Sequence, residues 1–251
     1  MKNAKKLLLA LLFAPLAASA AGPELKLDRA PDKTRDTAAL QRGAQVFVNY
    51  CLNCHGASYM RYNRLGDLGL SEQQIKDNLL FTADKVGEQM KIALRPAEAK
   101  EWFGAAPPDL TVIARSRASE FGSGADWLYT YLRTFYRDPE RPTGWNNLIF
   151  ENVGMPHVLW QLQGEQVLHV EKVKDAHGAE VEHKTLQLAK PGQLTKDDYD
   201  ALVADLVAYL VFMGEPMADT RKQIGIWVLI ALAVLFGLSY ALKKNYWKDI
   251  H

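Results

Sequence analysis

The chain is poor in cysteine: its 251 residues include only two, Cys51 and Cys54. With no third cysteine, no other thiol chemistry competes for this pair. The sequence also has no internal repeat and no low-complexity tract, and it has no charged residue between Ile224 and Leu242. The roughly 200 residues before that uncharged segment are enough for a single hydrophobic core with insertions.

The two cysteines lie in the run Cys51-Leu52-Asn53-Cys54-His55, which has the Cys-x-x-Cys-His pattern of a c-type haem attachment site. Thiols at positions i and i+3 project from the same side of a helical turn, so each can reach one vinyl group of a single porphyrin. The histidine that follows is then held under the ring as an axial iron ligand. The pattern predicts one covalently bound haem c, with His55 as a ligand of its iron.

The first 20 residues have the three parts of a secretory signal. Three lysines lie among the first six residues, an apolar run follows over residues 7–16, and Ala18-Ser19-Ala20 is a cleavage site of the A-x-A type. The alternative, an N-terminal membrane helix, would need a longer apolar run. Residues 1–20 are therefore interpreted as a signal peptide, and export agrees with covalent haem attachment.

The uncharged segment 224–242 would extend about 28 Å as a helix, which is enough to cross the hydrocarbon core of a membrane. Basic residues flank both ends, and Tyr246 and Trp247 are placed like an interfacial aromatic belt. A buried core helix is the alternative, but apolar residues surround the whole helix rather than one stripe. We expect residues 221–251 to be a membrane anchor with a short cytoplasmic tail, and residues 21–220 to be a periplasmic domain.

Local signals predict a mainly helical domain. Asp36 or Thr37 can cap a helix that runs into the Cys-x-x-Cys-His motif. Gly43 on this helix would let a second helix cross closely, although a tolerated glycine is the plainer explanation. Capping boxes, proline and glycine predict four further helices. These lie near residues 72–81 and 124–136, from Pro96 to Gly104, and from Thr195 to Gly214, where Leu202, Leu206, Tyr209, Leu210 and Met213 would share one side.

Between residues 164 and 190 the pattern changes to two β-rich segments, which predicts a hairpin at 165–189. The fold class is thus mainly α, a helical haem domain with loop and β-hairpin insertions and one C-terminal transmembrane helix. Three histidines on this hairpin are expected to be exposed: His169, His177 and His183.

A haem iron held by His55 has one further axial position. Met155 lies in the irregular segment Gly154-Met155-Pro156-His157, which could press a thioether onto a flat ring. His/Met ligation is common in electron-transfer haems, so we expect Met155 to be the second ligand, with His157 as the alternative. The other methionines are weaker candidates. Met60 is too close to the motif in the sequence, and Met90 has no local feature that favours it. Met213 and Met217 are expected to pack in the core.

The segment Ala106-Pro107-Pro108-Asp109 precedes two arginines, Arg115 and Arg117. Paired prolines form a stiff apolar wall of the kind that a porphyrin edge packs against. Arginine suits bidentate recognition of the propionate carboxylates. Without a haem these would be an ordinary loop and a solvated helix face. With one, we expect Pro108 to contact the porphyrin and at least one of the arginines to pair with a propionate.

Together these motifs resemble the cytochrome c1 family of the bacterial quinol–cytochrome c oxidoreductase (bc1) complex. The similarity covers nearly the whole chain in order, through Tyr50–His55, Trp102–Leu110, Arg115–Arg117, Gly154–Pro156, Tyr209–Pro216 and the C-terminal anchor. The resemblance implies thioether bonds at Cys51 and Cys54. It also implies His55 and Met155 as axial ligands, and Arg117 as a propionate partner.

The chain departs from the family at Trp127, where some members place a tyrosine near the propionates, so that role is not carried over. Some bacterial members also have an extra disulfide, for which this chain has no cysteines left.

The resemblance further implies a cytochrome c-like fold in the bacterial inner membrane and a role as an electron-transfer subunit with no catalytic residue of its own. A Rieske iron–sulfur protein would deliver the electron, and a soluble or anchored periplasmic cytochrome c would accept it. The expected partners are these two proteins and a cytochrome b, within a dimeric complex, with no nucleic acid. One alternative is an anchored cytochrome that feeds a terminal oxidase. Another is a thiol–disulfide oxidoreductase using Cys51 and Cys54, although that activity usually lies on a βαβ pattern.

Overall fold

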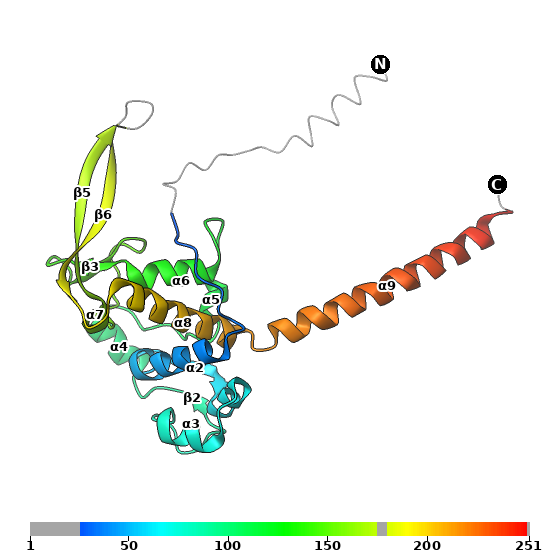
Figure 1. Ribbon diagram of the computed structural model, residues 1–251, viewed down its shortest axis with the longest axis horizontal. Coiled ribbons are helices and arrows are strands. Elements are labelled where there is room, and N and C mark those ends of the chain that lie inside the picture. Colours follow the sequence, from blue (N-terminus) through cyan, green and yellow to red (C-terminus); the bar gives the residue numbers. More distant parts are fainter. Residues whose placement is uncertain (1–25, 175–179, 250–251) are drawn as a thin grey trace.

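A computed structural model describes residues 26–174 and 180–249. The predicted signal peptide at 1–20 and His177 lie outside the described residues. The described part of the chain forms a helical domain, a hairpin that projects from it, and one long helix that leaves it (Figure 1). This arrangement confirms the predicted mainly α fold class.

Helices are distributed along the whole described chain, with short strands between some of them. They are α2 (Thr37–Val46), the π-helical turn η1 (Phe47–Cys51), the 3-10 helix η2 (Tyr62–Leu68), α3 (Glu72–Asn78), α4 (Pro96–Phe103), α5 (Ile113–Ser116), α6 (Gly124–Arg133), α7 (Trp160–Gln163), α8 (Lys196–Gly214) and α9 (Ala218–Trp247). The strands of the described residues form antiparallel pairs: β1 (Ala57–Arg61) with β2 (Gln89–Met90), β3 (Phe135–Arg137) with β4 (Trp145–Asn147), and β5 (Gly164–Lys174) with β6 (Glu180–Pro191).

The helices begin at the predicted caps. The Asp36 side chain accepts a hydrogen bond from the Ala39 amide at the start of α2. Ser71 and Ser123 each form a complete capping box, at the starts of α3 and α6. At the start of α8 the Thr195 hydroxyl accepts a hydrogen bond from the Asp198 amide. These side chains satisfy backbone amides that have no partner inside the helix, which is why each helix starts where it does.

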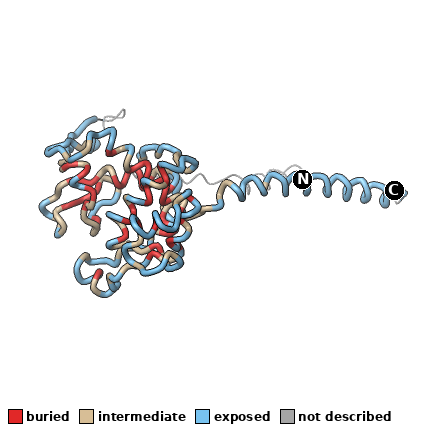
Figure 2. The backbone as a smooth tube through the Cα atoms, turned by 60° about the horizontal axis from the view of Figure 1, so that its bottom comes forward, coloured by how far each residue is buried: buried red, intermediate tan, exposed pale blue. Residues whose placement is uncertain are grey.

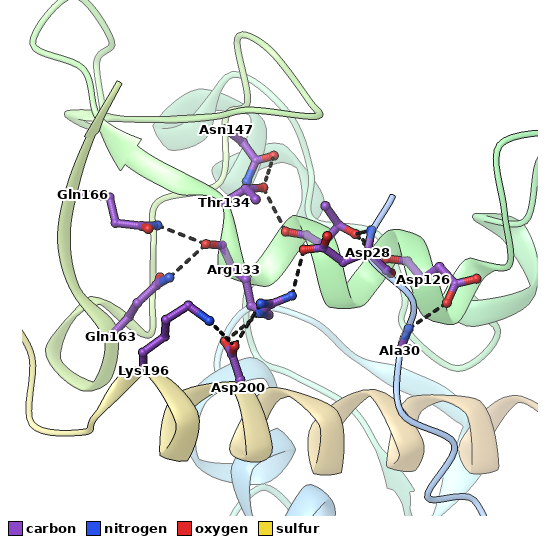
Figure 3. Close-up of polar contacts among 11 residues, drawn as sticks. Asp28, Ala30, Asp126, Arg133, Thr134, Asn147, Gln163, Gln166, Lys196 and Asp200 are labelled. Carbon is purple, nitrogen blue, oxygen red and sulfur yellow. Dashed lines mark hydrogen bonds and ion pairs between the residues drawn. The ribbon is translucent and has the colours of Figure 1, made fainter. Parts of the chain in front are cut away.

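Two helices end earlier than predicted. The helix predicted at 72–81 ends at Asn78. The helix predicted at 124–136 ends at Arg133, because two distant side chains form hydrogen bonds to its last carbonyl oxygen (Figure 3). The Arg133 carbonyl accepts hydrogen bonds from Gln163 at 2.9 Å and from Gln166 at 3.0 Å. The chain then continues as β3, which was not predicted.

The core is built around α8, against which α2, α5 and α6 pack (Figure 1). Figure 2 shows that the buried residues are concentrated in this domain, whereas the long helix that leaves it is exposed. Every residue of α8 from Val203 to Leu210 is buried, so the prediction of a single buried side was too narrow. Of the two explanations for Gly43, the close helix crossing is the correct one and the tolerated glycine is wrong. A Cβ atom at Gly43 would lie 2.1 Å from the Asp205 carbonyl oxygen of α8, so only glycine fits there.

A strap formed by residues 26–35 ties the N-terminal end of the described chain to this core. Asp205, which is 5% exposed, pairs with Lys33 at 2.8 Å and with Arg42 at 2.6 Å. Figure 3 shows a second anchor, where Arg133 pairs with Asp28 of the strap and with Asp200 of α8. Because the two anchors join the strap to α2, α6 and α8, they fix the helices that surround the site described below.

The predicted hairpin is confirmed as β5 and β6, which pair from Gly164 with Pro191 to Lys174 with Glu180. His169 and His183 are exposed on it, as predicted. The predicted membrane helix lies within α9, and no residue of α9 is buried. By length and composition α9 is the one candidate membrane span of the described chain.

Candidate functional site

An apolar cleft of about 300 Å³ opens beside α8. It is lined by every residue that the sequence predicted to bind the cofactor: Cys51, Cys54, His55, Pro108, Arg117 and Met155. These residues come from four stretches of the chain that are far apart in the sequence, so the fold brings them together. The volume and the apolar lining are typical of cofactor sites.

One part of the cleft is formed by the Cys-x-x-Cys-His motif. His55 Nδ1 lies 2.8 Å from the Pro108 carbonyl oxygen. Since a carbonyl can only accept, Nδ1 carries the hydrogen and Nε2 keeps its lone pair. Burial lowers the pKa of His55, and the hydrogen bond to Pro108 and the charge of Asp109 oppose this shift only in part. The imidazole is therefore neutral at pH 7, the form that binds metals.

The cysteines are not activated as nucleophiles. Burial raises the pKa of Cys51 to about 12, with a smaller contribution from Cys54. Thiol–disulfide oxidoreductases need the opposite shift, because the thiolate is the attacking species. The motif also follows α2 and η1 rather than a βαβ unit. The geometry therefore gives no support to the oxidoreductase alternative.

The Gly154-Met155-Pro156 segment forms another part of the cleft. The Tyr131 hydroxyl donates a hydrogen bond to Met155 Sδ at 3.4 Å. A Cβ atom at Gly154 would lie 3.0 Å from the Phe103 carbonyl oxygen, so the segment sits close against the end of α4. The hydrogen bond to Met155 and the close approach at Gly154 thus hold the thioether in the cleft.

His157, the alternative ligand, is not among the residues that line the cleft. It is 2% exposed, stacks on Phe135 with ring centroids 4.9 Å apart, and meets Trp145 edge-on at 5.1 Å. The other methionines of the described chain also lie outside the cleft. Met60, Met90 and Met213 are buried in the core, and Met217 is 55% exposed. Met155 is therefore the methionine that the fold places beside His55.

The two predicted arginines differ in position. Arg117 is half-buried and lines the cleft, with its guanidinium 4.4 Å from the centre of the Trp127 ring and 5.5 Å from that of Phe150. Arg115 is exposed and lies outside the cleft. Arg117 is therefore the arginine that can reach an anionic group bound in the cleft.

Besides Tyr50 and Phe103, which lie in motifs named above, three aromatic residues line the cleft that were not predicted to do so: Trp127, Tyr131 and Phe150. Trp127 and Tyr131 stack with ring centroids 4.7 Å apart. Their i, i+4 spacing on α6 places them on one helix face, so the sequence did contain a signal for this pair. Phe150 lies in a loop without a local pattern, and nothing in the sequence pointed to it.

The donor set fits a c-type haem. Two thiols, one neutral imidazole with an available Nε2 and one thioether share an apolar cleft with a guanidinium. These are the groups needed for two thioether bonds, two axial ligands and one propionate partner.

Comparison with known proteins also agrees with a c-type haem site. The model of the cytochrome C1 family matches residues 29–250. The chain is 46% identical over 250 residues to the cytochrome c1 of Allochromatium vinosum, covering 98% of this chain and 100% of that protein. It is 53% identical over 251 residues to a Nitrosomonas europaea protein described as ammonia monooxygenase gamma subunit, covering all of both chains. A cytochrome b/c1 of Bradyrhizobium diazoefficiens is 28% identical over 93% of this chain and 35% of that protein.

Proposed function

Because this chain belongs to the cytochrome c1 family, we propose that it is the haem subunit of a quinol–cytochrome c oxidoreductase (bc1) complex. Proteins of this family carry covalently bound haem c and serve as redox subunits. The observation that carries the proposal is that the thiols, imidazole and thioether predicted from the sequence all line one apolar cleft.

Each cleft residue has a distinct role in this proposal. Cys51 and Cys54 form the thioether bonds, and His55 binds the iron through Nε2, oriented by its hydrogen bond to Pro108. Met155 would supply the thioether ligand of the iron, with its sulfur held by the hydrogen bond from Tyr131. The haem supplies one-electron transfer, with a potential raised by His/Met ligation.

The remaining groups hold the edge of the cofactor. The Arg117 guanidinium is held over the Trp127 ring, where cation–π attraction fixes its position. From there it binds a propionate carboxylate, which it can do in a bidentate manner. Pro108 provides an apolar wall and, through its carbonyl, the acceptor for His55. No general acid, base or nucleophile is needed, because the chain transfers an electron and makes no bond in a substrate.

The proposed electron path rests on membership of such a complex. A Rieske iron–sulfur protein donates one electron to the haem, and a periplasmic cytochrome c accepts it. Residues 1–20 direct export, residues 21–220 form the periplasmic domain, and α9 anchors this domain in the inner membrane beside a cytochrome b. The length and apolar composition of α9 support the anchor.

The absorption spectrum of the full-length protein in detergent tests the cofactor. We expect a low-spin c-type spectrum, and haem staining that survives denaturing electrophoresis because the haem is covalently bound. Met155→Leu should lower the reduction potential and open the iron to carbon monoxide, while Met217→Leu, outside the cleft, should change neither. If Met155→Leu leaves both properties unaltered, Met155 is not the second ligand.

The Nitrosomonas relative supports a second candidate, in which the same haem domain serves a monooxygenase complex. Purification of the tagged full-length chain from its native membrane distinguishes the two candidate functions. Recovery of a cytochrome b, with loss of quinol–cytochrome c reductase activity on deletion, supports the bc1 assignment. Recovery of monooxygenase subunits, with loss of ammonia oxidation alone, supports the second candidate. Loss of terminal oxidase activity alone would instead support a cytochrome that feeds an oxidase.

A further inference from the structure

Asp109 directly follows the proline whose carbonyl accepts the His55 hydrogen bond. Its carboxylate accepts three hydrogen bonds: from the Ser58 amide at 2.7 Å, the Thr111 amide at 2.9 Å and the Thr111 hydroxyl at 2.6 Å. Partial burial acts to raise the pKa of Asp109, but these hydrogen bonds outweigh it and the pKa is lowered. The group is therefore a carboxylate at neutral pH.

The hydrogen bonds of Asp109 belong to a larger connection between two segments. The Leu110 amide donates to the Gly56 carbonyl at 2.8 Å, and the Tyr59 amide donates to the Thr111 hydroxyl at 3.3 Å. Residues 56–59, which follow the haem motif, are thus joined to residues 109–111, which follow Pro108. His55 and Pro108 immediately precede these two segments, so the connection fixes the distance between the imidazole and the carbonyl.

We propose that Asp109 is a positioning residue for His55 and helps to set the reduction potential of the haem. Its side chain holds the Pro108 carbonyl that orients the imidazole. Its carboxylate also carries a negative charge close to the haem motif, because it accepts a hydrogen bond at 2.7 Å from the Ser58 amide, three residues after His55, and no ion pair among the described residues neutralises it. A negative charge there stabilises ferric over ferrous iron and lowers the potential. This inference rests on the proposed haem function.

Two substitutions separate the charge from the hydrogen bonds. Asp109→Asn removes the charge but keeps an oxygen that can accept from Thr111. Asp109→Ala removes the charge and all three hydrogen bonds. Asp67→Asn is the control, because Asp67 is a partly exposed acid outside the cleft whose carboxylate pairs with Arg64 at 2.6 Å. The reduction potential of the haem measures the effect of the Asp109 charge. The low-temperature electron paramagnetic resonance spectrum of the ferric haem measures the orientation of the axial ligands.

The experiment is a redox titration of the full-length proteins in detergent, followed at the c-type absorption band. Asp109→Asn should raise the ferrous-to-ferric ratio at fixed ambient potential about threefold, or about 28 mV at 59 mV per tenfold change for one electron. Asp109→Ala should give the same rise and shifted resonance g values, whereas Asp67→Asn should match the wild type.

The inference is wrong if Asp109→Asn has the reduction potential of the wild type, or if Asp109→Ala retains haem and has the g values of the wild type, while wild type and variant both show the c-type band. That result would leave the proposed function intact. A wild-type protein without the c-type band would refute the proposed function instead. If Asp109→Ala does not retain haem, Asp109→Asn still decides the question, because it preserves the side-chain volume and part of the hydrogen bonding.

Discussion

Gly43 provides the sharpest test of the fold, because it lies where α2 meets α8. A Cβ atom at this position would lie 2.1 Å from the Asp205 carbonyl oxygen and 2.8 Å from Tyr209 Cβ. Non-bonded carbon atoms prefer separations of about 3.5–4.0 Å. In Gly43→Ala the two helices must therefore move apart by about 1 Å, and a gap of that size forfeits up to about half of the dispersion energy of each contact across it.

The expected cost follows from two opposing effects. Overpacking a core costs about 1–3 kcal/mol, and this site is at the upper end because the atoms in the way belong to the backbone of α8 and cannot rotate aside. Alanine is more favourable than glycine inside a helix by about 1 kcal/mol. We therefore expect Gly43→Ala to destabilise the domain by about 2 kcal/mol. For a domain of this size that corresponds to a fall of about 4–8 °C in the unfolding temperature.

Thermal unfolding of the full-length protein, followed by circular dichroism at 222 nm, measures this change. Gly66→Ala is the matched control, since a Cβ atom at Gly66 of η2 meets nothing within 4 Å. Gly66→Ala should unfold at or slightly above the wild-type temperature. If Gly43→Ala behaves like Gly66→Ala, the two helices do not cross as closely as described, and the reasoning fails.

Three further predictions concern the cleft and its surroundings. Tyr131→Phe should lower the reduction potential by the equivalent of up to about 1 kcal/mol, because Met155 Sδ loses its hydrogen bond; an unchanged redox titration would contradict this. Arg117→Gln should also lower the potential, because a cation beside a propionate favours ferrous iron, whereas the exposed Arg115→Gln should not; equal shifts would contradict the role of Arg117. Burial lowers the pKa of His157 to about 4 from 6.5, so the unfolded state binds more protons between these values. The unfolding free energy should fall by about 3 kcal/mol as the pH drops through that range, and in denaturant titrations at several pH values His157→Phe should show a smaller fall than the wild type.

The parts of the fold that depend on local signals could be predicted from the sequence. Asp36, Ser71, Ser123 and Thr195 cap helices where expected, because a capping side chain acts within three residues of its own position. The six residues predicted for the site all line the cleft, because Cys51, Cys54 and His55 lie in a motif with recognisable chemistry and the other three were inferred once a haem was expected.

The parts that depend on distant contacts could not be predicted. α6 ends at Arg133 because Gln163 and Gln166 bind its last carbonyl, and no local pattern near Arg133 reveals those partners. Likewise, Met155 and His157 lie two residues apart in one loop, and the sequence alone left both open as ligands. The packing of His157 against Phe135 separates them, since it turns the imidazole into the core and leaves the thioether in the cleft.

The short connection between α8 and α9 limits how far the cleft can stand above the lipid. Leu210 of α8 lines the cleft, α8 ends at Gly214, and only residues 215–217 precede α9. With Ile224 at the membrane surface, helical rises of 1.5 Å per residue and an extended connection put Leu210 at most about 30 Å above it. A protein that exchanges electrons with a group bound in this cleft must therefore approach close to the membrane surface. Inserting residues into the connection would raise the cleft without altering its lining.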